Sequence, residues 1–225
     1  MNVLLIFLGL LPSFIWLGFF LQEDIHPEPK RTIFPLFLVG MFSALLAAGI
    51  QYLLQLEFPD NFANLKTFGP IFGFAAVEEI LKFFPVFLIM RKSKFFDEPI
   101  DAMIYMITAA SGMAAIENIG IMFGNQILDE RIGLLVFRFL GATLLHVLSS
   151  GLVGYYWAKG IIKKKVFIFS VFGLILATAL HAIFNYSIIV FSGIFIYPII
   201  ILIFAAFFIF NDFEILKKND NIKIN

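Results

Sequence analysis

The stretch IFPLFLVGMFSALLAAGIQYLLQL at residues 33–56 contains no charged side chain, which is typical of a helix that crosses a lipid bilayer. A helix needs roughly 20 predominantly apolar residues to span a hydrocarbon layer of about 30 Å. Short polar stretches separate this run from similar ones, and together the runs cover 3–21, 33–56, 68–90, 100–123, 133–157, 166–190 and 192–210. We therefore expect an all-α, polytopic transmembrane helix bundle with about seven spans.

The composition agrees with a membrane protein. Of the 225 residues, 61% are hydrophobic and 14% are charged, and the mean hydropathy is +0.96. Soluble domains have about 45–50% apolar and about 25% charged residues, so a water-soluble globule, a nucleic-acid binder and a disordered chain are excluded. The absence of cysteine excludes disulfides, thiolate metal sites and a cysteine nucleophile.

Lysine and arginine predict the orientation, because loops rich in these residues stay in the cytoplasm. With the N-terminus outside and the C-terminus cytoplasmic, the cytoplasmic side receives Lys30, Arg31, Arg91, Lys92, Lys94, Lys159, Lys163, Lys164, Lys165, Lys217, Lys218 and Lys223. Only Lys66 and Arg131 then fall outside. We expect one transmembrane domain over 1–210 and a polar cytoplasmic tail over 211–225, in a multi-pass protein of the cell membrane.

Seven ionisable side chains lie within the expected spans, namely Glu78, Glu79, Lys82, Glu117, Arg138, His146 and His181. Each costs about 2.5–3.5 kcal/mol at the centre of a bilayer, so such residues face the bundle interior and usually mark a functional site. Their occurrence on four consecutive spans predicts a single polar site.

The third span carries Glu78, Glu79 and Lys82 in the motif EEILK. On a helix Lys82 lies about 40° from Glu78 and about 60° from Glu79, so its ammonium can neutralise one carboxylate while the other stays free. A buried ion pair between Glu78 and Lys82 that fixes helix register is the structural alternative.

The next three spans supply the other candidates, which are Glu117, Asn118, Arg138, His146, His181 and Asn185. Counted from the outer span ends at 1.5 Å per residue, Glu117, His181, Glu78 and His146 lie at depths of about 9, 14, 15 and 20 Å. These side chains can meet near the midplane or slightly outside it. Arg138 lies closer to the surface, where it either pairs with Glu117 or extends toward the interface.

Carboxylates, imidazoles and an amide are the groups needed to activate water. A glutamate can take a proton from water and return it to a leaving amine, while histidine and asparagine stabilise the oxyanion. The same residues could hold a divalent metal such as zinc, with His146, His181 and Glu117 as ligands. The residues alone do not choose between the two mechanisms.

Other hydrolase designs are missing from the sequence. No H-E-x-x-H motif occurs, and Ala109 stands where a G-x-S-G serine motif before Gly112 needs glycine. Asp101 is the only aspartate in or near the spans, so an aspartyl dyad is excluded. Asp101 is grouped with Lys82, Asn118 and Arg138 as a supporting residue. The pair Gly120 and Gly124 matches G-x-x-x-G and predicts helix packing.

Five motifs, in order, resemble the PrsW family of intramembrane proteases, which are related to the type II CAAX prenyl proteases. They are EEILK at 78–82, EPIDAMIY at 98–105, GMAAIEN at 112–118, HVLSSGLVG at 146–154 and HAIFN at 181–185. The resemblance implies a prokaryotic protein with Glu78 and Glu79 as a catalytic pair, His146 and His181 as catalytic histidines, and Glu117 and Asn185 as supporting residues. It also implies cleavage of a membrane-anchored protein, with an anti-sigma factor as the example.

The leading hypothesis is an intramembrane protease that hydrolyses a peptide bond of a membrane-anchored protein in the lipid bilayer, without a nucleic-acid partner. A proton- or cation-coupled transporter could use the same glutamates and histidines as a relay. Transporters usually show internal repeats and broken helices, and the chain has no halves of matching pattern. A noncatalytic membrane scaffold of the same superfamily is the third possibility.

Overall fold

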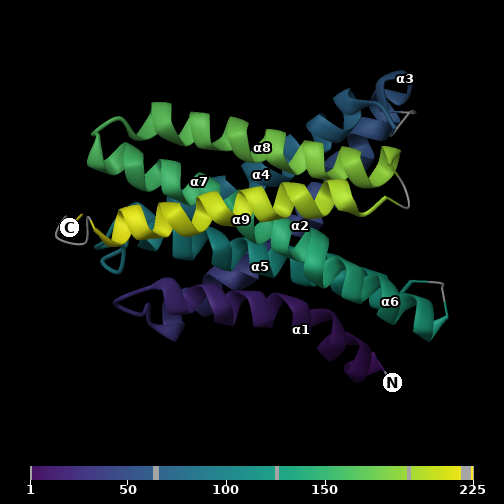
Figure 1. Ribbon diagram of the computed structural model, residues 1–225, viewed down its shortest axis with the longest axis horizontal. Helices are drawn as coiled ribbons and strands as arrows, with labels where there is room; N and C mark the ends of the chain where they lie inside the picture. Colours follow the sequence, from purple (N-terminus) through teal and green to yellow (C-terminus); the bar gives the residue numbers. More distant parts are fainter. Residues whose placement is uncertain (1, 63–65, 125–126, 192–193, 219–223, 225) are drawn as a thin grey trace.

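The computed structural model describes residues 2–62, 66–124, 127–191, 194–218 and 224. Within these residues the secondary structure is entirely helical, and the expected all-α class is confirmed. In chain order the elements are α1 (Asn2–Phe20), η1 (Leu21–Glu23), α2 (Lys30–Glu57), α3 (Pro59–Phe62), α4 (Phe68–Met90), α5 (Asp101–Met122), α6 (Leu128–Arg138), η2 (Phe139–Thr143), α7 (Leu144–Ile162), α8 (Val166–Val190) and α9 (Ile196–Lys217). The long helices run side by side as a bundle (Figure 1).

Six helices of the described chain are long and apolar enough to cross a membrane. They are Asn2–Glu23, Lys30–Glu57, Asp101–Met122, Leu128–Ile162, Val166–Val190 and Ile196–Lys217. The one remaining expected span, 68–90, corresponds to α4, which has 23 residues and carries the three charged residues of EEILK. The chain is therefore a multi-pass membrane protein, and α4 carries its charged residues in the middle of the helix rather than at its ends.

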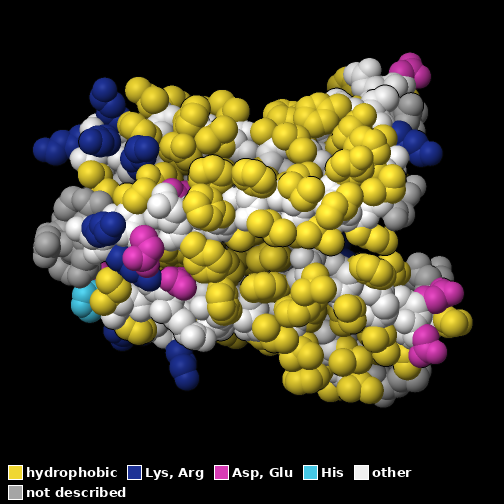
Figure 2. All heavy atoms as spheres, in the orientation of Figure 1, with side chains coloured by type: hydrophobic (Ala, Val, Ile, Leu, Met, Phe, Trp, Pro, Cys, Tyr) yellow, Lys and Arg dark blue, Asp and Glu magenta, His cyan; other side chains and the backbone are white. Residues whose placement is uncertain are grey.

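The surface separates into an apolar middle and charged ends (Figure 2). Basic side chains gather at the end of the bundle where the C-terminus and the α7–α8 turn lie, which we call the lysine-rich end. Large hydrophobic side chains such as Phe167, Phe204 and Phe207 are exposed on the helices, as expected for contact with lipid. The positive-inside rule places the lysine-rich end in the cytoplasm, and this orientation stays a prediction.

The last helix is longer than the sequence indicates. Residue 210 was the expected end of the final span, but α9 continues to Lys217, and Asp212, Phe213 and Leu216 are buried. The segment NDFEILKK looks polar in the sequence because of its charged residues. Its apolar residues Phe213 and Leu216 nevertheless share the inner face of the helix. Helix α9 therefore extends into the segment 211–217 that the sequence assigns to the polar tail.

Helix α5 occupies the centre of the bundle, and small residues let its neighbours approach closely. It packs against α1, α2 and α7, and most of its side chains are buried. A Cβ added to Gly40 on α2 would meet the Ala109 carbonyl of α5, and one added to Gly154 on α7 would lie 2.5 Å from the Met103 Cα. These close contacts fix α2 and α7 on either side of α5.

A π-helical segment, η2, separates α6 from α7 and precedes His146 by a few residues. Single π-turns widen a helix and leave a backbone group without its usual partner. Here the Trp16 indole on α1 donates a hydrogen bond of 2.7 Å to the Phe139 carbonyl oxygen. The contact ties the junction between α6 and α7 to the first helix.

Candidate active site

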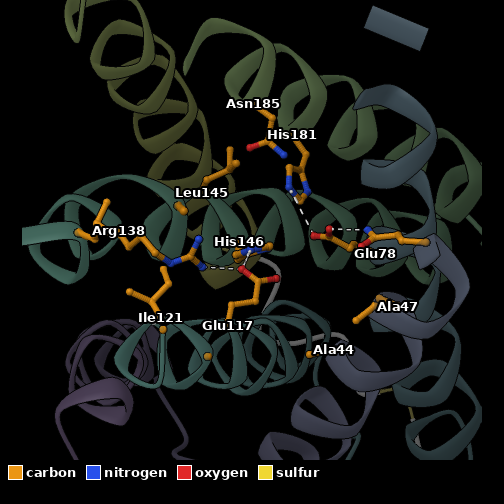
Figure 3. Close-up of a pocket in the computed structure, with 16 residues that line it drawn as sticks. Ala44, Ala47, Glu78, Glu117, Ile121, Arg138, Leu145, His146, His181 and Asn185 are labelled. Atoms are coloured by element: carbon orange, nitrogen blue, oxygen red, sulfur yellow. Dashed lines mark hydrogen bonds and ion pairs between the residues drawn. The ribbon is translucent and has the colours of Figure 1, made fainter. Parts of the chain in front are cut away.

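A cavity of about 580 Å³ lies between α2, α4, α5, α6, α7 and α8 (Figure 3). Its polar lining residues are Gln51, Glu78, Glu117, Arg138, His146, His181 and Asn185, and most of the remaining lining residues are small or apolar. The structure therefore brings together polar side chains that are far apart in the sequence.

Glu79 is fully buried and forms the centre of a hydrogen-bonded network behind the cavity. Its Oε1 lies 2.6 Å from Lys82 Nζ and accepts a hydrogen bond of 3.0 Å from the Ser149 hydroxyl. The same oxygen lies 2.8 Å from His181 Nδ1. Lys82 therefore neutralises Glu79, and the alternative pair with Glu78 is wrong.

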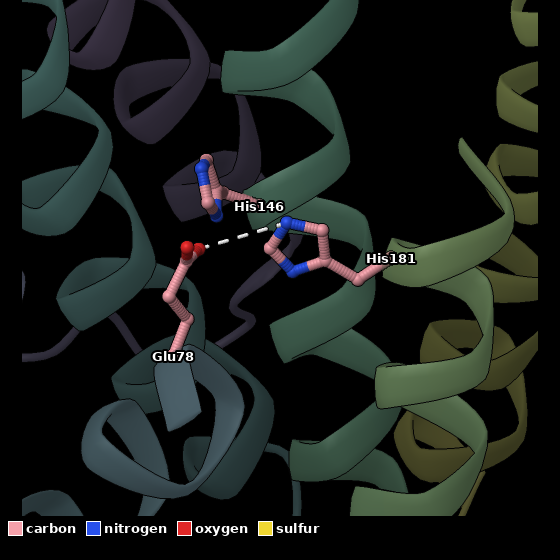
Figure 4. Close-up of side chains that lie close together, drawn as sticks. All are labelled: Glu78, His146 and His181. Atoms are coloured by element: carbon pink, nitrogen blue, oxygen red, sulfur yellow. Dashed lines mark ion pairs between the residues drawn. The ribbon is translucent and has the colours of Figure 1, made fainter. Parts of the chain in front are cut away.

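Glu78 points in a different direction from its neighbour and lines the cavity. Its Oε1 accepts a hydrogen bond of 2.9 Å from the Gln51 side chain on α2. Its Oε2 lies 3.6 Å from His181 Nε2 (Figure 4). The Glu79 carboxylate can only accept, so His181 Nδ1 donates to it, and in the neutral imidazole Nε2 then carries the lone pair that faces Glu78. Glu78 is thus the carboxylate of the doublet that meets the open space.

Both nitrogens of His146 have polar neighbours. Nδ1 lies 3.2 Å from Lys82 Nζ, and Nε2 lies 3.1 Å from Glu117 Oε2. An ammonium can only donate, so in this arrangement Nδ1 accepts and Nε2–H donates to Glu117. The rings of His146 and His181 meet edge to face with centroids 5.0 Å apart.

Arg138 links α6 to this network. It donates to Glu117 Oε2 through Nη2 at 2.5 Å and to Asn118 Oδ1 through Nε at 2.7 Å. The Asn118 amide in turn donates to the Thr143 hydroxyl in η2 at 3.1 Å. Of the two expected positions for Arg138, the structure has the pair with Glu117.

Glu78, His146 and His181 can each offer one ligand atom, and these atoms lie within 4.8 Å of one another (Figure 4). Two histidines and one carboxylate form a known catalytic zinc ligand set. Metal-binding histidines usually donate their other N–H to a carboxylate or carbonyl, as His181 does to Glu79. The donor set fits a divalent metal once Lys82 Nζ releases His146 Nδ1, the one nitrogen that His146 can offer while its Nε2–H donates to Glu117. Glu78 then stands in the place where the sequence suggested Glu117, which is instead held by Arg138.

Two residues singled out in the sequence have other roles. Asp101 does not line the cavity; its Oδ2 accepts hydrogen bonds from the backbone N–H groups of Asp97 and Glu98 at 3.0 and 2.8 Å. It therefore stabilises the turn before α5. Gly120 lines the cavity, and a Cβ added there would meet nothing within 4 Å, so the packing role expected for it is wrong.

Sequence reasoning did not identify Gln51 and Ser149, which bind the two glutamates from α2 and α7. Gln51 is an amide within the apolar run 33–56, which is the one signal that could have indicated it. Ser149 follows His146 by three residues and so shares its helix face. Neutral polar residues are common in spans, so neither position stands out without its neighbours.

Comparison with known proteins identifies the family. Curated relatives named "Protease PrsW" are 26% identical to this chain in Geobacillus kaustophilus, Oceanobacillus iheyensis and Bacillus subtilis. The matches cover 81%, 96% and 67% of this chain and 78%, 97% and 66% of the respective relatives. No solved structure shows a significant match. A family profile described as "PrsW family intramembrane metalloprotease" matches residues 28–210, so the chain belongs to this family of membrane-embedded peptidases.

Proposed function

We propose that this peptidase hydrolyses a peptide bond of a membrane-anchored protein in the cavity lined by Glu78, His146 and His181. The observation that carries the proposal is the meeting of these three side chains, from α4, α7 and α8, in a space large enough for a peptide segment. Regulated cleavage of a membrane-anchored regulator, such as an anti-sigma factor, is the biological role that the family resemblance suggests.

The two glutamates have different tasks in this proposal. Glu78 Oε2 and His181 Nε2 face each other at 3.6 Å, and Glu78 takes the proton of the attacking water and delivers it to the leaving amine. Glu79 has no access to the cavity and holds His181 Nδ1–H, which keeps the His181 lone pair directed at Glu78. Asn185 lines the cavity one turn from His181 and offers an amide N–H to the developing oxyanion.

A divalent metal such as zinc would be held by Glu78, His146 and His181, with Glu78 then a ligand in place of its proton-transfer role, and it would supply Lewis-acid activation of water and of the scissile carbonyl. Lys82 neutralises Glu79, and its ammonium would leave His146 Nδ1 to the metal while keeping the pair with Glu79. Glu117 orients His146 through its Nε2–H, and Arg138 holds Glu117.

Cleavage by the reconstituted protein tests this assignment. We expect Glu78→Gln to lower kcat by about 10²–10⁴-fold, the usual contribution of a positioned proton-transfer group. The matched control is Glu130→Gln, the same change at an exposed position on α6, which keeps wild-type activity. Equal rates for Glu78→Gln and the control would show that the cavity is not the catalytic centre.

A further inference from the structure

A second cavity, of about 460 Å³, lies between α7, α8 and α9 and shares no lining residue with the active-site cavity. Most of its wall is apolar, with Leu180 on α8 and Ile201, Phe204 and Phe208 on α9. Phe204 and Phe208 are also more than half exposed, so this part of the bundle faces lipid. The peptidase mechanism uses none of these residues.

One acidic side chain lines this apolar cavity. Asp212 on α9 is only 8% exposed, and among the described residues it makes no hydrogen bond or ion pair within 4.0 Å. A carboxylate in apolar surroundings is costly unless a cation or hydrogen-bond donor compensates it. Asp212 therefore marks a place where a ligand with a positive, hydrogen-bonding group gains free energy.

Lys159 carries a positive charge near Asp212 but forms no ion pair with it. Lys159 on α7 attracts the carboxylate electrostatically, but its ammonium lies over the aromatic rings of Tyr155 and Tyr156, 5.4 and 5.5 Å from their centroids. Asp212 lines the cavity, and Lys159 lies outside the lining, one turn beyond Tyr155 on α7, so a negative charge in the cavity is followed by a positive charge just beyond it. A ligand that carries both signs of charge is complementary to this arrangement.

The dimensions match one lipid leaflet. From Ile201 to Asp212 the wall formed by α9 is about 16 Å long at 1.5 Å per residue. Half of the hydrocarbon layer is about 15 Å thick. Asp212 precedes the end of α9 at Lys217 by about 7.5 Å, toward the lysine-rich end, where phospholipid head groups would lie.

We propose that this cavity binds a phospholipid with a primary ammonium head group, of the phosphatidylethanolamine class, from the leaflet at the lysine-rich end. The acyl chain lies along Leu180, Ile201 and Phe204, the ammonium donates to Asp212, and the phosphate faces Lys159. An anionic head group without an ammonium would add a negative charge beside Asp212. Choline head groups carry no N–H donor for the carboxylate.

Native mass spectrometry of the full-length, delipidated protein tests the proposal with equal amounts of phosphatidylethanolamine, phosphatidylcholine and phosphatidylglycerol of one acyl composition. The wild type is expected to retain the ethanolamine lipid about tenfold better than the other two, the effect of one hydrogen bond to a charged group. Asp212→Asn is expected to abolish this preference.

Two further variants separate specific binding from a general lipid effect. Glu214→Gln removes an acidic charge from the same helix at an exposed position, and it is expected to keep the preference. Leu180→Trp fills the cavity and is expected to lose the lipid although Asp212 is intact. Equal retention of all three lipids by the wild type, stronger binding of phosphatidylglycerol, or an unchanged preference in Asp212→Asn would overturn the proposal.

Discussion

At the level of single residues, Glu28 illustrates how burial controls a charge outside the spans. Burial raises the pKa of its carboxyl from an ordinary value of 4.5 to about 7, the Tyr105 hydroxyl opposes this rise, and the negative charges of Asp24 and Asp97 add to it. Between about pH 4.5 and 7 the folded protein keeps a proton that the unfolded chain has lost. The free energy of unfolding therefore falls as pH rises through this range.

This pH dependence can be measured as the difference in Tm between pH 5 and pH 7.5. In Glu28→Gln, which resembles the protonated acid, we expect the Tm difference between these two pH values to shrink relative to wild type. The exposed change Glu214→Gln serves as the control and is expected to leave the difference as it is. An identical pH dependence in Glu28→Gln and wild type would contradict the assignment.

The residue types of the candidate site could be predicted from the sequence, but their partners could not. Ionisable residues in an apolar chain stand out because they are costly there, and this identified Glu78, His146 and His181. Helix angles placed Lys82 slightly nearer to Glu78 than to Glu79. The structure has the opposite pair because Ser149 and His181, on other helices, also converge on the Glu79 carboxylate. Contacts between helices thus decided the pairing.

At the level of elements, hydropathy predicted the long helices well and their irregularities poorly. The expected span 68–90 coincides with α4, because Arg91 and Lys92 directly follow the apolar run and mark its end. The end of α9 and the π-helical segment η2 were not predictable in the same way. A widened turn changes backbone hydrogen bonds without changing composition, so FLGAT at 139–143 looks like any apolar stretch.

Arg138 makes α6 part of the active site, and its substitution tests this link. Arg138 binds both Glu117 and Asn118, so its guanidinium fixes the carboxylate that orients His146. We expect Arg138→Gln to lower kcat by about 10–100-fold, the usual effect of losing a partner behind a catalytic group, with a smaller change in KM. Arg138→Lys keeps the positive charge but lacks the planar guanidinium that binds Glu117 and Asn118 together, so its kcat is expected to lie between those of Arg138→Gln and wild type.

The control for this prediction is Arg131→Gln on the same helix. Arg131 donates to the Met122 backbone carbonyl at 2.6 Å and does not line the cavity, so kcat is expected to stay near wild type. If both variants lowered kcat equally, the effect would belong to the stability of α6. A loss confined to KM would instead assign Arg138 to substrate binding.

At the level of the whole molecule, the site depends on how closely helices distant in sequence approach one another. Gly40 and Gly154 allow α2 and α7 to contact the backbone of α5, and this brings Gln51 and His146 to the same cavity as Glu78. The sequence indicated that polar residues would meet in the bundle. The shape of the cavity depends on interhelical distances, which single spans do not reveal.

A metal at Glu78, His146 and His181 would join α4, α7 and α8, so its removal should affect the stability of the whole bundle as well as activity. A ligand that binds only the folded state stabilises it by about 2.7 kcal/mol at 100 times its Kd. We expect zinc to raise the Tm of the metal-free wild type and a chelator to reverse the change. Glu78→Gln and His181→Ala should lose both the shift and the bound metal measured by elemental analysis. Glu130→Gln, the exposed control, should keep both.

The opposite outcome is a wild type that contains no metal, shows no shift in Tm and cleaves at full rate under chelator. Water activation would then fall to Glu78 and His181 alone, because Lys82 and Arg138 already neutralise Glu79 and Glu117.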